Sequence, residues 1–459
     1  MKKLILISVL FPAILIAQSI KGIVISQKDN ISVENTNVFA LSSKTGTITD
    51  ENGKFSLNLL PEFKNDETLE FSHIGYITKK VSLSYLIKNN YKVFLEEEVQ
   101  NLLGVTIAAN PKLKTKLAFT EITSLKHPVY SFGSFLKDDK IYISGGDAYP
   151  EIDHMAKVRA KIANPSLQDF LNEGTGTAKR HYKKYFSIYD IKTNSWEFPD
   201  LKLQVRAYHN IHFYNNLIYI LGGKKMFVNK VSSWEYLQDK IEVLDLEKRS
   251  IKVDKTNPHQ AADFASFTHK DNIILMGGSI KATESGIKDF TDKVHLYNIT
   301  SGYWYELTSM PTAEETAGIL IDDKIYLIGG FNGKPISKIE TFDLVTEKWL
   351  TEGELFSGLE RPAITYNDDI IYFFEDEKMY TYNLKSKQLK EYEINLPLKF
   401  SAMYYNDNKL YILGGRIDNS YSKIPSAKVF SIDLNEFKLT NPNKIKNLSQ
   451  ETTLAKIQG

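Results

Sequence analysis

Hydrophobic positions form a pattern that recurs along the chain after residue 116. In each copy a short apolar run ends in a pair of glycines, most plainly in Lys324-Ile-Tyr-Leu-Ile-Gly329-Gly330. The other pairs are Gly145-Gly146, Gly222-Gly223, Gly277-Gly278 and Gly414-Gly415. A short apolar run that is rich in β-branched and aromatic residues and bounded by glycine predicts a buried strand followed by a turn. We therefore expect an all-β fold in this region.

The spacing of the glycine pairs gives the length of the repeating unit. Successive pairs lie 77, 55, 52 and 85 residues apart. Because the last gap is too long for one unit of about fifty residues, we expect a unit that lacks the pair. Residues 361–376 fit, since they hold the same apolar run around Tyr372 and place Glu375-Asp376 where the glycines would stand. The region is therefore predicted to contain six units.

Each unit shows four strand signals. In the fourth unit they are Glu315–Leu320, Lys324–Ile328, Ser337–Leu344 and the residues around Trp349. In the other units the third strand ends in an aspartate or asparagine, which favours a turn into the next strand. These residues are Asp190, Asp245, Asn298, Asn383 and Asp433, and two units also have a tryptophan in the place of Trp349, Trp196 and Trp304. This pattern resembles the kelch repeat over residues 117–441.

The resemblance to the kelch repeat implies a six-bladed β-propeller around a central channel. A four-stranded sheet cannot bury both faces alone, so sheets arranged around an axis cover one another. We predict that Leu117–Ile122 forms the outer strand of the last blade, beside Lys428–Asp433, because joining the two ends of the ring removes an exposed edge. The alternative is Glu436–Thr440, which directly follows that strand.

Residues 19–100 carry a second, shorter set of strand signals. Polar and apolar residues alternate in seven segments, as they do in half-buried strands. The segments are Ile20–Ser26, Thr36–Leu41, Gly46–Thr49, Lys54–Leu59, Thr68–His73, Ile77–Leu83 and Tyr91–Leu95. Seven short strands in this length predict a small seven-stranded β-sandwich.

This region contains four characteristic stretches: Lys21-Gly22-Ile-Val, Asn35-Thr-Asn-Val38, Thr47-Ile-Thr49-Asp50-Glu-Asn52-Gly53-Lys-Phe55-Ser-Leu57 and Phe71-Ser-His-Ile74-Gly75-Tyr76. Together they resemble the carboxypeptidase regulatory-like domain, a module common in envelope proteins of the Bacteroidetes. The resemblance implies a scaffold or docking role, since the module has no catalytic residues in this family. A calcium loop at Asp50 and Glu51 is an alternative, but such a site takes six or more oxygen ligands, and Asn-Gly is typical of a tight hairpin turn.

The N-terminal segment Met1–Gln18 is predicted to be a secretory signal peptide. Lys2 and Lys3 precede the apolar run Leu4–Ala17, which is too short to span a bilayer comfortably. We therefore expect an exported protein of the periplasm or the outer membrane, with no transmembrane segment in the mature chain. Residues 101–116 are predicted to be a linker. Residues 442–459 are predicted to be a polar tail, and its shortness favours the periplasm over the cell surface.

The composition excludes several kinds of chemistry. The chain contains no cysteine, which excludes disulfides, thiolate nucleophiles, thiolate metal sites and a cysteine-linked lipid anchor. Its 57 basic and 56 acidic residues give a net charge of +1, so we expect no nucleic-acid partner. We also expect no cofactor and no metal, because His209 and His212 are three residues apart on a strand and so face opposite sides.

The candidate site is one mouth of the central channel. In kelch-like folds the segments that lead into the first strand of each blade line this mouth, and the insertions between second and third strands emerge on the same face. The longest insertions are residues 147–182, with a helix expected at Ala156–Leu171, and residues 224–239, 279–292 and 416–427. The candidate ligand-binding residues are His127, Tyr130, Arg206, Tyr208, His209, Asp263, Phe264, Glu315, Arg361 and Phe400.

Several functions remain open for such a mouth. Mixed charges and aromatic rings suit a sugar, a peptide or an anionic glycan, and the alternative is that they are solvated rim residues and structural ion pairs. We favour a non-enzymatic envelope protein that binds a protein or glycan partner. The second possibility is a sugar-modifying enzyme of the sialic-acid mutarotase type, in which Glu315 with Arg206 or Arg361 would supply acid and base. The third is a surface adhesin or a subunit of an outer-membrane assembly.

Overall fold

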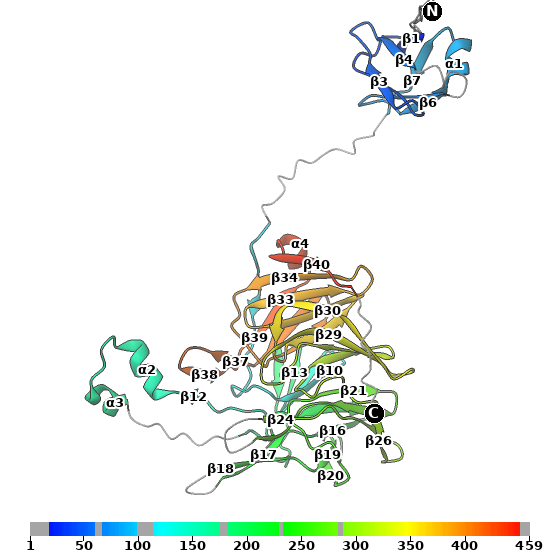
Figure 1. The fold of residues 1–459 in the computed structure, drawn as a ribbon. Coiled ribbons are helices and arrows are strands. Elements are labelled where there is room, and N and C mark those ends of the chain that lie inside the picture. The colour runs from blue at the N-terminus through cyan, green and yellow to red at the C-terminus, as the bar shows by residue number, and fades with distance from the viewer. Residues whose placement is uncertain are drawn as a thin grey trace, which may run out of the picture. The chain divides into compact units, whose positions relative to one another are not determined.

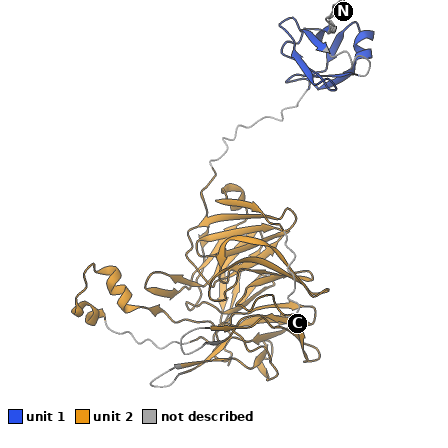
Figure 2. Cartoon of the chain, viewed as in Figure 1, with its two compact units in different colours: residues 1–109 blue, residues 110–459 orange. Residues whose placement is uncertain are grey.

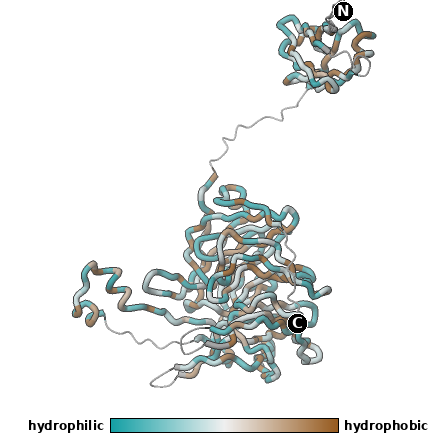
Figure 3. Tube along the Cα trace, viewed as in Figure 1, coloured by the Kyte–Doolittle hydropathy of each residue, from teal (hydrophilic) through white to brown (hydrophobic). Residues whose placement is uncertain are grey.

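The computed structural model describes residues 18–59, 67–98, 113–173, 182–228, 233–282 and 288–449. The chain divides into two compact units, residues 1–109 and 110–459 (Figure 2). In Figure 3 brown, hydrophobic stretches alternate with teal, hydrophilic ones along both units, as expected of strands that bury one face. Within the described ranges no helix has the length and apolarity needed to cross a bilayer.

The first unit is a β-sandwich of two sheets, with strand orders β4-β1-β7 and β3-β2-β5-β6. Its strands are β1 (Gln18–Ser26), β2 (Asn37–Ala40), β3 (Thr45–Ile48), β4 (Lys54–Leu59), β5 (Thr68–Ser72), β6 (Lys79–Ser82) and β7 (Lys92–Leu95). Val24 of one sheet and Val38 and Phe71 of the other belong to one hydrophobic core. The predicted seven-stranded sandwich is confirmed.

A short helix, α1 (Leu83–Lys88), is the element of this unit that the alternation did not predict. Ser82 ends β6 and caps the helix, because its side chain accepts a hydrogen bond from Tyr85 N at 3.3 Å. Leu86 is fully buried in the core of the sandwich. The predicted strand Ile77–Leu83 is therefore corrected to the shorter β6.

Among the described residues, the second unit contains six sheets that each include four antiparallel strands, and we call them blades 1 to 6 (Figure 1). Blade 1 consists of β10 (Gly133–Lys137), β11 (Lys140–Ser144), β13 (Phe186–Asp190) and β14 (Ser195–Glu197). Blade 2 consists of β15 (Asn210–Tyr214), β16 (Leu217–Leu221), β19 (Ile241–Asp245) and β20 (Ser250–Asp254). Blade 3 consists of β21 (Ala265–His269), β22 (Asn272–Met276), β25 (Val294–Asn298) and β26 (Trp304–Leu307). Blade 4 consists of β27 (Gly318–Ile321), β28 (Lys324–Ile328), β29 (Ile336–Asp343) and β30 (Lys348–Leu359). Blade 5 contains β31 (Ala363–Asn367), β32 (Ile370–Glu375), β33 (Lys378–Asn383) and β34 (Gln388–Ile394). Blade 6 consists of β35 (Ala402–Asn406), β36 (Lys409–Leu413), β39 (Val429–Asp433) and β9 (Thr120–Glu121).

The glycine pairs join neighbouring blades. The N–H of the second glycine donates to a carbonyl that leads into the next blade, as in Gly146 N to Arg206 O at 2.9 Å. Gly415 N of blade 6 donates to Val129 O at 3.0 Å, ahead of blade 1, so these bonds close a ring. A side chain would not fit at the first glycine of a pair. At Gly145, where φ is +63°, a Cβ atom would lie 2.4 Å from Arg206 O.

Blade 6 takes its outer strand from the N-terminal end of the second unit. β9 pairs antiparallel with β39, and Ile122 N donates to Val429 O at 2.9 Å. The alternative strand, Glu436–Thr440, instead contains the helix α4 (Glu436–Leu439). The prediction that an N-terminal strand completes the last blade is confirmed, but the predicted bounds Leu117–Ile122 are too long. The strand is Thr120–Glu121, and Leu117 instead pairs with β34 of blade 5.

Blade 5 carries additional strands at its outer edge. β40 (Lys444–Asn447) pairs antiparallel with β34, and β8 (Lys116–Leu117) pairs in parallel with the end of β34. Leu448, which follows β40, is 9% exposed and packs in a core cluster of blades 4 and 5. Part of the segment that we expected to be a polar tail therefore belongs to the propeller.

The insertions between second and third strands form further elements. The first contains β12 (Glu151–Ile152) and two short helices, α2 (His154–Lys161) and α3 (Leu167–Glu173), where one helix was expected. The others fold back as hairpins, β17 (Lys224–Val228) with β18 (Ser233–Leu237), β23 (Ser279–Ala282) with β24 (Lys288–Phe290), and β37 (Arg416–Asp418) with β38 (Ser422–Pro425). β12 of blade 1 pairs with β38 of blade 6, which links the two insertions (Figure 1).

Candidate functional site at the mouth of the propeller

The residue after each glycine pair is tied to the segment that leads into the first strand of the same blade. Tyr130 and Asp147 form such a backbone bridge in blade 1. The bridges of the other blades that have a glycine pair are Ala207 with Lys224, Ala262 with Ser279, Glu315 with Phe331, and Lys399 with Arg416. These bridges hold the start of each insertion beside the segment that leads into the blade, so side chains from both gather at one end of the channel.

Blade 5 lacks the glycine pair and replaces the backbone bridge with a side chain. Glu375 is 5% exposed, and its carboxylate accepts hydrogen bonds from Glu360 N at 2.9 Å and Arg361 N at 3.0 Å. Burial raises the pKa of Glu375, and the two backbone donors act against that rise. The carboxylate thereby fixes the backbone from which the Arg361 side chain projects.

The mouth itself is a cavity of about 700 Å³. Five of the predicted residues line it, namely Tyr208, Asp263, Glu315, Arg361 and Phe400. Side chains from the insertions complete the wall, among them Lys224, Lys288 and Arg416. The expectation that the insertions and the segments leading into the blades share one face therefore agrees with the structure.

Charged groups in the mouth lie in oppositely charged pairs. Arg361 reaches from blade 5 to the buried carboxylate of Asp263, which precedes blade 3, and its Nε lies 3.8 Å from Glu315 Oε2. Lys288 Nζ donates to Glu315 Oε1 at 2.6 Å. Burial lowers the pKa of Arg361 to about 10, so its guanidinium remains charged at neutral pH. The pairs fix the positions of these side chains and nearly cancel their net charge.

Two guanidinium groups lie close to the Phe400 ring. The Arg361 guanidinium is 4.2 Å from the centre of the Phe400 ring and that of Arg416 is 4.7 Å from it. Arg416 also forms a bidentate pair with Asp418, at 2.6 and 2.8 Å. Cation–π contacts of this kind strengthen where water is excluded, so the ring and both arginines form one ordered wall of the mouth.

Hydrogen-bonded tyrosines support the mouth from below. Tyr130 OH and Tyr208 OH both donate to Asp147 Oδ2, at 2.9 and 2.6 Å. Asp147 is fully buried, and the Arg416 guanidinium lies 5.0 Å from the centre of the Tyr130 ring. Tyr130 thus acts from behind the wall of the mouth, where it packs against Phe400.

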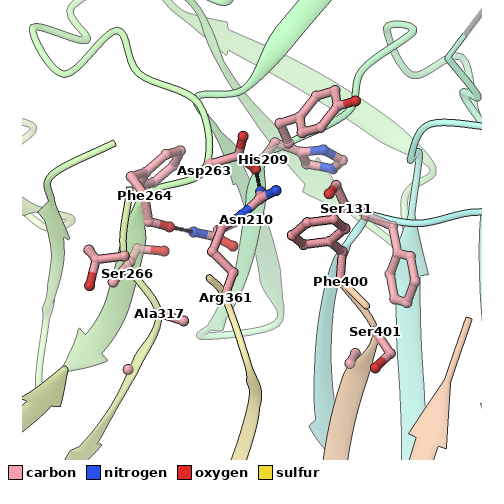
Figure 4. Close-up of a pocket in the computed structure, with 16 residues that line it drawn as sticks. Ser131, His209, Asn210, Asp263, Phe264, Ser266, Ala317, Arg361, Phe400 and Ser401 are labelled. Atoms are coloured by element: carbon pink, nitrogen blue, oxygen red, sulfur yellow. Dashed lines mark hydrogen bonds and ion pairs between the residues drawn. The ribbon is translucent and has the colours of Figure 1, made fainter. Parts of the chain in front are cut away.

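A second, narrower cavity of about 210 Å³ lies along the channel (Figure 4). It is lined by the segments that lead into the blades and by small residues at the start of the first strands, such as Ala317. Four residues line both cavities, namely Tyr208, Asp263, Arg361 and Phe400. The mouth and this axial cavity therefore meet at the Arg361–Asp263 pair and the Phe400 ring.

The remaining predicted residues lie away from the mouth. Arg206 is 1% exposed inside blade 2, where it pairs with Glu242 at 3.0 Å. His127 stacks on Tyr185 with ring centres 4.3 Å apart, beside a separate small cavity. The expectation that Arg206 and His127 line the mouth is thus corrected, since Arg206 forms an ion pair in the core and His127 stacks on Tyr185.

The two remaining candidates are core residues that also line the axial cavity. Phe264 is 4% exposed and His209 is 2% exposed. Burial holds the pKa of His209 well below its usual value and lowers that of His212 to about 4, so both imidazoles are neutral. His212 binds Ser266 and Thr268 hydroxyls on the neighbouring blade, at 2.8 and 3.0 Å. Among the described residues, no three His, Asp or Glu side chains gather as a metal site.

Sequence reasoning missed the residues that follow the glycine pairs. Asp147, Lys224, Phe331 and Arg416 all take part in the mouth or its support. The signal was present, because each stands directly after a glycine pair in the sequence. Lys288 has no such signal, because it reaches the mouth through the register of the β23–β24 hairpin.

The ring of four-stranded sheets and the hydrogen bonds of the glycine pairs define a β-propeller, which follows a small β-sandwich in the chain. Comparison with known families agrees. Residues 20–107 match the family model described as CarboxypepD_reg-like domain, and residues 316–355 match the Kelch motif.

Individual relatives are distant. The chain is 24% identical to Kelch-like protein 41b of Danio rerio over 169 residues, which cover 36% of this chain and 26% of that protein. It is 20% identical to Beta-scruin of Limulus polyphemus over 246 residues, covering 50% of this chain and 21% of that protein. The chain thus spans about a quarter of the length of these relatives. The solved structure described as "Structure of YjhT" is 14% identical with a TM-score of 0.49, covering 66% of this chain and 95% of that chain.

Proposed function

We propose that the protein is a non-enzymatic binding protein of the cell envelope, whose propeller holds a protein or glycan partner at the mouth of its channel. The observation that carries this proposal is the cavity of about 700 Å³, whose wall combines aromatic rings with ordered charged groups. Sites of this size with a few fixed polar groups are typical of specific binding. Kelch domains also generally mediate protein interactions, and the Kelch motif match supports the same role.

The pairing of charges in the mouth favours binding over catalysis. Asp263 and Glu315 each have a cationic partner, and so does the Phe400 ring. Side chains that are already ordered lose little conformational freedom when a partner docks, which favours affinity. The location in the envelope rests on the basic and apolar start of the chain, Met1–Gln18. The N-terminal sandwich would then serve for docking within the envelope.

A second candidate is a sugar-modifying enzyme of the sialic-acid mutarotase type. One observation favours it, namely that Glu315 and Arg361 lie 3.8 Å apart beside the mouth, so that a carboxylate and a guanidinium face one ligand site. Arg206 has no part in it, because it is buried in blade 2. Exchange NMR between the anomers of N-acetylneuraminate would detect such activity, with Glu315→Gln as the inactive control. An exchange rate equal to that without protein would remove this candidate.

Affinity purification from the native envelope tests the binding role. The tagged protein is compared with Lys288→Met, which keeps the apolar stem but removes a charge of the mouth. The matched control is Lys248→Met, which removes an exposed lysine that is paired with Asp245 at a distant turn. We expect mass spectrometry to find a protein or glycan retained by the wild type and by Lys248→Met but lost from Lys288→Met. Equal retention by all three, or no retained partner, would refute the role of the mouth.

A further inference from the structure

The axial cavity is surrounded by polar atoms that lack hydrogen-bond partners. Ser131 Oγ, Thr316 Oγ1 and Arg361 Nε are buried and find none among the described residues, and the same holds for both ring nitrogens of His209. All four residues line this cavity (Figure 4). A buried polar atom without a partner costs about 1–3 kcal/mol, so a group that enters the cavity and bonds to these atoms gains more than it would at an already satisfied surface.

The volume of the axial cavity admits more than a single water molecule. One water molecule needs a cavity volume of roughly 10–15 Å³, whereas the volume of this cavity is about 210 Å³. It opens toward the mouth at the Arg361–Asp263 pair and the Phe400 ring, which belong to both cavities. A ligand held at the mouth can therefore extend one end into the channel.

The charged groups beside this opening determine which chemical group of a ligand can enter the axial cavity. The Arg361 guanidinium is already paired with Asp263, and Glu315 lies 3.8 Å from its Nε. An anionic group would meet these two carboxylates and would compete with Asp263 for the same cation. An uncharged hydroxyl group both donates and accepts, so it can bond to the Thr316 and Ser131 hydroxyls and to the Arg361 N–H together.

We propose that the axial cavity is a deep subsite that takes the uncharged, hydroxyl-bearing end of a saccharide bound at the mouth. This inference rests on the proposed binding function and narrows its partner to a glycan with a neutral terminal sugar. Thr316 and Ser131 would select hydroxyl groups, while the Phe400 ring would lie beside the sugar where it passes from the mouth into the channel.

Two variants test the subsite without altering the charges of the mouth. Ala317→Leu places a larger side chain in the axial cavity, and Thr316→Val removes one hydroxyl at nearly constant volume. Ala160→Leu adds the same volume on an exposed face of α2 and is the matched control. Binding of D-glucose, D-galactose and D-mannose is measured by saturation-transfer NMR and calorimetry, with N-acetylneuraminate as the anionic comparison and thermal unfolding as a check of the fold.

We expect at least one neutral sugar to bind, with affinity lost in Ala317→Leu, unchanged in Ala160→Leu and reduced about fivefold in Thr316→Val, which is the effect of one hydrogen bond. Three results would overturn the subsite. They are no binding of any neutral sugar, equal binding by Ala317→Leu, and tighter binding of N-acetylneuraminate than of every neutral sugar. If envelope partners still depend on Lys288 while Ala317→Leu retains them, the binding function stands and the subsite alone is refuted.

Discussion

Replacement of Glu375 tests whether a single carboxylate holds blade 5 where the other blades use a glycine pair. In Glu375→Ala the backbone N–H groups of Glu360 and Arg361 lose their acceptors, at 2.9 and 3.0 Å. Both groups are only partly buried, so we take the lower end of the usual cost, about 1 kcal/mol each. Removal of one buried methylene adds about 1 kcal/mol. Burial raises the pKa of this carboxylate, which shows that its charged form is destabilised in the folded protein. Its removal therefore offsets part of the loss in stability.

The net expectation is a loss of about 2 kcal/mol in the free energy of unfolding of the second unit for Glu375→Ala, and of about half that for Glu375→Gln, which keeps one acceptor oxygen. Urea unfolding followed by tryptophan fluorescence measures it, because all four tryptophans lie between residues 196 and 349 and so report on the second unit alone. If both variants unfold at the same urea concentration as the wild type, or if Gln and Ala are equally destabilising, the two hydrogen bonds are not what holds this blade.

Three further outcomes follow from the structure and the sequence. Burial, with a smaller contribution from the Glu340 carboxylate, raises the pKa of Glu314 to about 8. Because the folded state then binds the proton more tightly, stability should fall as pH rises from about 4.5 to 8, by at most about 5 kcal/mol, and urea unfolding of Glu314→Gln should lack this slope. Ile122→Pro removes the N–H that bonds Val429 O beside β9 and should cost about 2–3 kcal/mol; an unchanged melting temperature would contradict closure by this strand. Cell fractionation with N-terminal sequencing should find the protein in the envelope fraction, cleaved near Ala17, and an uncleaved cytoplasmic protein would contradict the signal peptide.

The repeat made the strands of the propeller predictable, because each blade repeats a local pattern of apolar run and turn. The pairing of β9 with β39 was also predictable, since Glu121-Ile-Thr-Ser is similar to Glu306-Leu-Thr-Ser, which begins in the outer strand of blade 3. The hairpin β17–β18 was expected only as a long insertion. An isolated two-stranded hairpin is only marginally stable. The hairpin β17–β18 therefore depends on packing against the propeller, through Met226 and Leu237, and this packing is not visible in the sequence.

The candidate site was less predictable, because backbone turns decide which residues face the channel. Ser131, Tyr208, Asp263 and Phe400 each stand two residues before a first strand and adopt a left-handed φ of 47°, 60°, 58° and 55°. Such φ angles are uncommon for these residue types, and no residue pattern in the sequence predicts them. The turn at Tyr208 places Arg206 inside blade 2 and Tyr208 at the mouth, although both were equally good candidates from the residue pattern alone.

Closure by an N-terminal strand has a consequence for the order of events during synthesis. The partners of blade 6, Glu121 and Phe430, are separated by about 300 residues of chain. Contacts between such distant segments are slow to form, because a long loop must close before they stabilise anything. Until the last blade is complete, β39 presents an unpaired edge to other chains. A nascent chain therefore remains open to aggregation, or to capture by a chaperone, until the strands of blade 6 have been synthesised, and a truncation within blade 6 would leave that state permanent.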